Sequence, residues 1–124
     1  MNWKLVFVLP LLIIGCISQE TEASLAPDQF EKGLKESDVV LIDVRTPEEF
    51  ESGHITGAKN INWNDDAFES QMSSLSKDDT YYIYCLKGGR SGSVMSWMKE
   101  NGFQSVYDLK GGISAWNDEG KPLE

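Results

Sequence analysis

One short stretch of the chain, YCLKGGRSG at residues 84–92, combines the residue types needed for nucleophilic chemistry on an anion. Cys85 ends an apolar segment that is expected to be a strand, and Ser91 opens a segment with helical spacing. Two glycines between a strand and a helix allow successive backbone N–H groups to converge above the helix N-terminus, which makes an anion site. The same field favours a thiolate over a thiol, so Cys85 is predicted to be a nucleophile at neutral pH.

The other loop residues are predicted to bind the substrate. They are Leu86, Lys87, Gly88, Gly89 and Arg90, with Ser91 behind them as the expected helix N-cap. Taken singly, the glycines could form only a turn, and the two cations could be only solvated charges. Their combination with a cysteine at a strand end, in a chain whose formal net charge is −9, favours an anion-binding catalytic loop.

Residues 26–124 are predicted to form one α/β domain with a mainly parallel central sheet and helices on both faces, because strand and helix signals alternate. Continuous apolar runs predict strands at 39–44, 80–85 and 105–109, with a short strand at 58–62. Apolar spacing and capping residues predict helices at 26–36, 65–75, 91–102 and 111–120, and a helical turn at 46–53. Ligands of such sheets bind beyond the carboxyl ends of the strands, where Cys85 is expected to lie.

The N-terminus, MNWKLVFVLPLLIIGC, has the layout of an export signal: a lysine, an apolar run, a small residue and then Cys16. The apolar run is too short to span a bilayer comfortably. The letters IIGC resemble the lipobox of prokaryotic lipoproteins, which implies a signal peptide at 1–15, a lipidated Cys16 and a flexible tether over 16–25. An uncleaved membrane anchor is the alternative. Both place the domain outside the cytoplasm, attached to a membrane in the periplasm or at the cell surface.

The acidic composition of the chain argues against nucleic acid as a binding partner. The chain has 124 residues, which suits one domain, and its 20 acidic against 11 basic residues would repel a nucleic-acid backbone. The sequence contains two cysteines. Lipidation of Cys16 would leave Cys85 as the only free thiol, either a reactive group or a buried and inert one.

Three blocks of the sequence resemble the signatures of the rhodanese family: IDVRTPEEFESGHITGAKNIN, YCLKGGRS and VYDLKGGISAWNDEGKPL. The resemblance covers nearly all of the chain after the N-terminal segment. It implies a sulfurtransferase whose Cys85 takes sulfane sulfur from a small anionic donor such as thiosulfate. The persulfide would then pass its sulfur to a thiol or to cyanide, and neither a metal nor an organic cofactor is needed.

Two residues of these blocks depart from the family pattern, and three others are signature residues with an expected structural role. Thr56 stands where the family usually has proline, and Leu86 is apolar where many members have arginine or lysine, which lowers the positive charge of the loop. Asp43 and Arg45 follow a strand end and could border the active site, but we expect them to buttress the fold, for example through an ion pair of Arg45 with Glu49. His54, the only histidine, is interpreted as structural.

Two other functions compete with catalytic sulfur transfer. The domain could be a sulfur carrier or docking module for an envelope partner, with little turnover alone. It could also be a phosphatase or arsenate reductase on the same fold. The second is disfavoured because four residues separate Cys85 from Arg90, whereas the loop of the related phosphatases is one residue longer.

Overall fold

The computed structural model describes residues 23–124, so the predicted signal peptide and Cys16 lie outside the described residues. The domain is built on a five-stranded sheet with the order β1-β5-β4-β2-β3, and every neighbouring pair is parallel. Its strands are β1 (Ser24–Leu25), β2 (Val39–Asp43), β3 (Lys59–Asn60), β4 (Thr80–Tyr84) and β5 (Ser105–Leu109). The predicted fold class is thereby confirmed.

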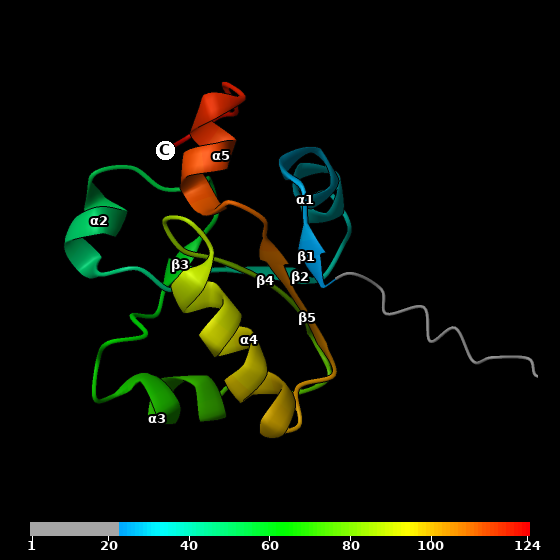
Figure 1. Cartoon of the computed structure of the whole chain (residues 1–124). Helices are drawn as coiled ribbons and strands as arrows, with labels where there is room; N and C mark the ends of the chain where they lie inside the picture. The colour runs from blue at the N-terminus through cyan, green and yellow to red at the C-terminus, as the bar shows by residue number, and fades with distance from the viewer. Residues whose placement is uncertain (1–22) are drawn as a thin grey trace, which may run out of the picture.

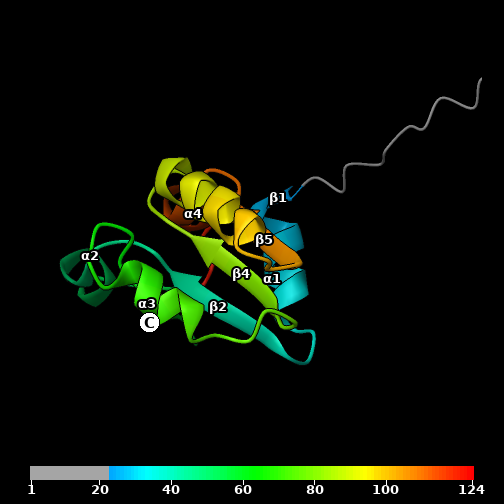
Figure 2. The same ribbon diagram turned by 90° about the horizontal axis from the view of Figure 1, so that it is seen from below.

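Four of the five helices within residues 23–124 cover the two faces of the sheet. The helices are α1 (Pro27–Leu34), α2 (Pro47–Glu51), α3 (Phe68–Ser73), α4 (Gly89–Glu100) and α5 (Gly112–Asp118). In Figure 1, α1 and α5 lie above the sheet while α3 and α4 lie below it, and the view from below in Figure 2 shows α3 and α4 in front of the strands. The short helix α2 lies outside this layering, in the connection from β2 to β3, at the left of Figure 1.

The core follows from the alternation of side chains along β4. Tyr81 and Ile83 face the cluster under α3 and α4, whereas Tyr82 and Tyr84 face the cluster under α1 and α5. Ile83 is fully buried, and burying a side chain of this size contributes about 1.5–3 kcal/mol relative to leaving it exposed. Both faces of the central strands are therefore apolar, which explains the continuous hydrophobic runs in the sequence.

Secondary structure within the described residues includes part of the segment that the sequence predicts to be a tether. Residues 16–25 were expected to form a flexible tether, but Ser24 and Leu25 form β1 beside β5. The N–H of Asp108 donates to the carbonyl of Ala23 and that of Lys110 to the carbonyl of Leu25, both at 2.8 Å. A two-residue strand has no periodicity to read, because its neighbour β5 supplies the hydrogen-bonding edge that makes it a strand.

None of the helices within residues 23–124 has the length and apolar character needed to cross a membrane.

Candidate active site

The thiol of Cys85 lies at the carboxyl end of β4 and is almost fully buried, with 1% of the residue exposed. The chain turns back over the sulfur, so that the N–H of Gly88 donates to Sγ at 3.0 Å. Gly88 reaches this position with φ +113°, a conformation that a residue with a side chain rarely adopts. The glycine in the loop is therefore needed to aim a backbone donor at the nucleophile.

The surroundings of Cys85 favour its thiolate. Burial is the largest influence and opposes ionisation, but hydrogen bonds from the Ser91 hydroxyl and from backbone N–H groups of the loop outweigh it. They lower the pKa of the Cys85 thiol below its ordinary value. Because α4 begins at Gly89, the sulfur also lies near the partial positive charge of a helix N-terminus.

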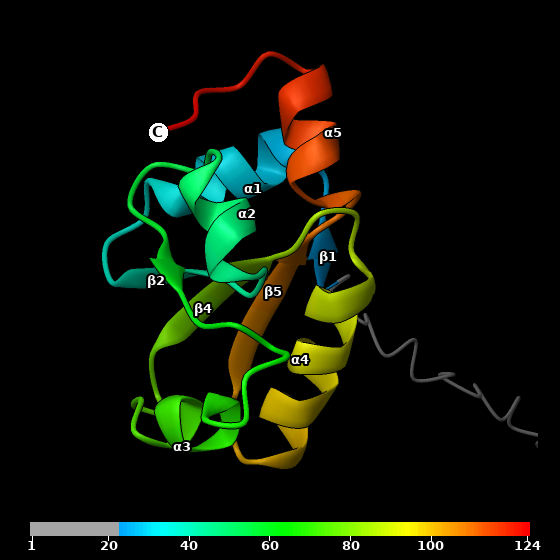
Figure 3. The same ribbon diagram turned by 90° about the vertical axis from the view of Figure 1, so that its left-hand side faces the viewer.

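Helix α5 fixes the start of the loop through backbone contacts. The N–H of Ile113 donates to the carbonyl of Cys85 at 2.9 Å, and that of Ser114 to the carbonyl of Leu86 at 3.1 Å. A Cβ on Gly112, whose φ is +62°, would collide with both of these carbonyls. Gly112, the second glycine of the Gly111–Gly112 pair, therefore lets α5 approach the catalytic loop, as Figure 3 shows where the β4–α4 loop passes beside the start of α5.

Arg90, a predicted substrate-binding residue, is held by a carboxylate from another element. Its two terminal nitrogens contact the two carboxylate oxygens of Glu49 on α2 at 2.7 and 2.9 Å. This hydrogen bonding to Arg90 is the main cause that lowers the pKa of Glu49 to about 2. The structure thus places Arg90 at the loop but compensates its charge, a pairing that sequence reasoning missed because the partners are 41 residues apart.

Three of the remaining loop residues are exposed to solvent. Leu86 is 40% exposed, and Lys87 and Gly89 are exposed as well. Within residues 23–124 Lys87 makes no ion pair. Lys87 is therefore the uncompensated cation of the loop, next in sequence to the exposed apolar residue Leu86.

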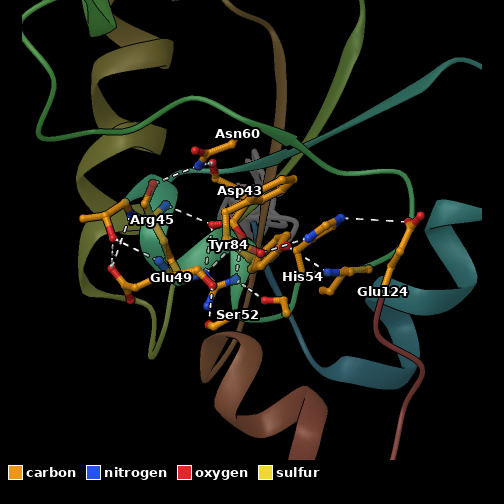
Figure 4. A network of polar contacts seen from close by, with 12 residues as sticks. Asp43, Arg45, Glu49, Ser52, His54, Asn60, Tyr84 and Glu124 are labelled. Carbon is orange, nitrogen blue, oxygen red and sulfur yellow. Dashed lines mark hydrogen bonds and ion pairs between the residues drawn. The ribbon is translucent and has the colours of Figure 1, made fainter.

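Asp43 and Arg45 form a buried ion pair with each other (Figure 4). Nη2 of Arg45 is 2.7 Å from Oδ2 of Asp43 and donates to the carbonyl of Gly53, also at 2.7 Å. The predicted pair of Arg45 with Glu49 is therefore wrong. Arg45 instead ties the end of β2 to the segment after α2, and the side chain of Asn60 donates to the carbonyls of both Asp43 and Arg45.

His54 lies in the same network of polar contacts (Figure 4). Its ring stacks on that of Phe50 with centroids 3.8 Å apart, and Nδ1 lies 3.0 Å from the Phe50 carbonyl. Its backbone exchanges two hydrogen bonds with Glu124. These contacts are structural, as the sequence interpretation expected.

Ser91 does not cap α4 as the sequence predicts, because Gly88 occupies the N-cap and Ser91 lies in the first turn. Its hydroxyl oxygen lies 3.5 Å from the Cys85 sulfur and 2.9 Å from Oδ2 of Asp108 on β5. Asp108 is 4% exposed and was not among the predicted site residues. The signal that could have found it is an acidic residue inside a strand expected to be buried.

Comparison with known families matches residues 26–119 to the Rhodanese-like domain. The chain belongs to the rhodanese-like family. The resemblance noted in the three sequence blocks is thereby confirmed, and this rhodanese-like domain carries the cysteine at the end of β4.

A solved structure and a sequence relative agree with this family assignment. A rhodanese-like domain protein from Staphylococcus aureus has a crystal structure that is 39% identical, with a TM-score of 0.69, covering 82% of this chain and 95% of that one. A protein named Sulfurtransferase from Allochromatium vinosum is 36% identical over 86 residues, which cover 69% of this chain and 78% of that protein.

Not every relative carries a sulfurtransferase name. A tRNA uridine(34) hydroxylase from Onion yellows phytoplasma is 33% identical over 104 residues, which cover 81% of this chain but 34% of that protein. Membership of the rhodanese-like family therefore establishes the scaffold, and the activity has to be argued from the site.

Proposed function

We propose that this protein is a sulfurtransferase in which Cys85 carries sulfane sulfur as a persulfide from a small donor to a thiophilic acceptor. The observation that carries the proposal is a buried thiol with a lowered pKa, held by a backbone N–H at the start of a helix. Such a site stabilises negative charge on a sulfur atom.

The reaction consists of two displacements at sulfur. The Cys85 thiolate attacks the outer sulfur of the donor, the donor's S–S bond breaks, and sulfite leaves with the bonding electron pair when the donor is thiosulfate. The terminal sulfur of the persulfide anion then lies over the loop, where backbone N–H groups and the N-terminus of α4 stabilise it. A thiolate or cyanide attacks that sulfur, and the Cys85 thiolate is regenerated as the leaving group.

The cations near Cys85 determine how strongly the site attracts an anionic sulfur donor. Lys87 is the cation available to an incoming anion, because Arg90 is paired with Glu49. We infer that the site accepts thiosulfate but gives a dianion less charge compensation than two free cations would.

Sulfur loading tests the proposal directly. The full chain is incubated with thiosulfate or inorganic polysulfide, and peptide mass spectrometry then measures the mass of the segment that contains Cys85. We expect one added sulfur atom on wild type and none on Cys85→Ser. If neither donor loads Cys85, the sulfurtransferase proposal fails, and turnover of a phosphate ester that depends on Cys85 would favour a phosphatase instead.

We also propose, from the sequence alone, that Cys16 is lipidated and anchors the domain to a membrane outside the cytoplasm. Metabolic labelling with an alkyne fatty acid should mark the wild-type protein and not Cys16→Ser. Labelling that persists in the variant would contradict the lipoprotein assignment.

A further inference from the structure

The hydroxyl group of Ser91 has more acceptors around it than it has hydrogens. Its oxygen lies 2.9 Å from Oδ2 of Asp108, 3.2 Å from the carbonyl of Gly88 and 3.5 Å from the sulfur of Cys85. A serine hydroxyl has a single hydrogen to donate. When it donates to Asp108, the oxygen can only accept from Cys85, and this arrangement fits the protonated thiol. A thiolate requires the hydroxyl hydrogen to turn toward sulfur.

Asp108 depends on that same hydrogen. Its carboxyl group is buried on β5, and among the described residues Oδ2 receives a hydrogen bond only from Ser91, while Oδ1 has no partner at all. A buried carboxylate without donors is strongly unfavourable. If Ser91 turned to the thiolate and Asp108 stayed charged, two anions would face each other across one hydroxyl group and the carboxylate would lose its hydrogen bond.

We propose that Asp108 is a positioning residue that stores the proton of the Cys85 thiol and exchanges it through the Ser91 hydroxyl. The proposal deepens the proposed function, because it states where the proton goes when the nucleophile forms. Proton measurements made without any sulfur donor test it separately, so its failure and the failure of sulfur transfer are distinguishable.

The exchange conserves atoms and charge. The proton of the thiol moves from Sγ to Oγ of Ser91 while the hydroxyl proton moves from Oγ to Oδ2 of Asp108. The electron pair of the S–H bond stays on sulfur, and the carboxylate becomes a neutral acid. The hydrogen bonds then run in reverse, with Asp108 donating to Ser91 and Ser91 donating to the thiolate. The persulfide of Cys85 is also an anion, so the Ser91 hydroxyl can donate to it in the same arrangement.

Other charged groups near the end of the sheet do not supply the missing partner. Arg90 on α4 is paired with Glu49 of α2. Asp43, the last residue of β2, and Arg45 compensate each other's charge. Lys87 lies in the exposed loop, and Lys110 follows β5 as an exposed residue. No ion pair of Asp108 occurs within residues 23–124.

The first test follows the reactivity of Cys85 toward iodoacetamide across a pH series, with peptide mass spectrometry separating Cys85 from Cys16 in the full chain. Wild type should show two steps, because interacting groups titrate as a pair. Asp108→Asn should show one step, and full reactivity should be reached about one pH unit or more lower, because a neighbouring like charge is removed. Asp79→Asn, an exposed acid before β4, should match wild type.

The second test needs no change at Asp108. In a carbon-13 NMR titration of wild type, the carboxyl carbon of Asp108 should shift over the same pH interval in which Cys85 becomes reactive. In Cys85→Ser this shared transition should disappear. A carboxyl signal that stays constant while Cys85 titrates would overturn the proposal, and so would a wild-type reactivity profile with one step that Asp108→Asn leaves unchanged.

Discussion

Glu49→Gln is the substitution that most directly tests how the Arg90 pair shapes the site. The glutamine keeps the shape of the side chain. The hydroxyl and the backbone N–H of Thr46 donate to a carboxylate oxygen of Glu49 at the start of α2, and the glutamine oxygen can still accept both hydrogen bonds. What is lost is one negative charge, 2.7 Å from Arg90. Arg90 thereby becomes a free cation next to Lys87.

The expected gain for an anionic donor follows from the geometry. The exposed fractions of the Arg90 and Glu49 side chains are 27% and 29%, so solvent screens their charges substantially. At such a site the removal of one like charge is worth about 1 kcal/mol to an incoming anion. Since 1.4 kcal/mol is a factor of ten, kcat/KM for thiosulfate should rise about fivefold. The gain should appear mainly as a lower KM, because Arg90 would bind the ground state as well.

The assay compares two donors and two variants. Thiosulfate and a neutral organic trisulfide are supplied to wild type, Glu49→Gln and Glu48→Gln, and sulfur transfer to cyanide is measured. Glu48 is an exposed neighbour on α2 without an ion pair in the described residues, so its variant removes the same charge without releasing Arg90. We expect the fivefold rise only for Glu49→Gln with thiosulfate. A rise of equal size in Glu48→Gln, or no rise in a folded Glu49→Gln, would refute the reasoning.

Three further predictions concern stability. In a denaturant titration, Gly112→Ala should lower the free energy of unfolding by about 2–4 kcal/mol, because the new methyl group would collide with the Leu86 carbonyl and the residue has a positive φ. The control Gly92→Ala, which places its methyl group in open space on α4, should leave the free energy of unfolding unchanged or raise it. Asp43→Asn should cost about 3–5 kcal/mol in that titration by leaving the Arg45 charge buried without its partner; a loss below 1 kcal/mol would contradict a buried ion pair. The pairing with Arg90 lowers the pKa of the Glu49 carboxyl group from 4.5 to about 2, so the ion pair should stabilise the fold fully above pH 4.5 and lose this contribution as the pH falls toward 2. The free energies of unfolding of wild type and Glu49→Gln should therefore differ by about 1 kcal/mol or less at pH 6 and converge near pH 2.

The sequence predicts the framework well because the signals are local. Strands β2 and β4 lie where continuous apolar runs occur, and Thr46 with Pro47 marks the start of α2 as the capping pattern indicates. Strand β1 escapes prediction since its two residues are extended only through pairing with β5.

The site is predictable in its cysteine and loop, but not in its polar partners. The N-cap of α4 was assigned to Ser91 from residue preference, whereas the turn over the sulfur requires a left-handed residue and therefore Gly88. Glu49 and Asp108 come from α2 and β5, and their contacts with the loop arise only when distant segments pack together. Spacing along the chain contains no information about which acid meets which hydroxyl or guanidinium.

The backbone hydrogen bonds from α5 to the carbonyl groups of residues 85 and 86 have a consequence for engineering. The contour of the catalytic turn is set by main-chain atoms, while the side chains of Leu86 and Lys87 are exposed and Lys87 makes no ion pair within residues 23–124. These two positions are therefore suited to randomised libraries, in which donor preference can be reshaped by selection while the nucleophile keeps its alignment.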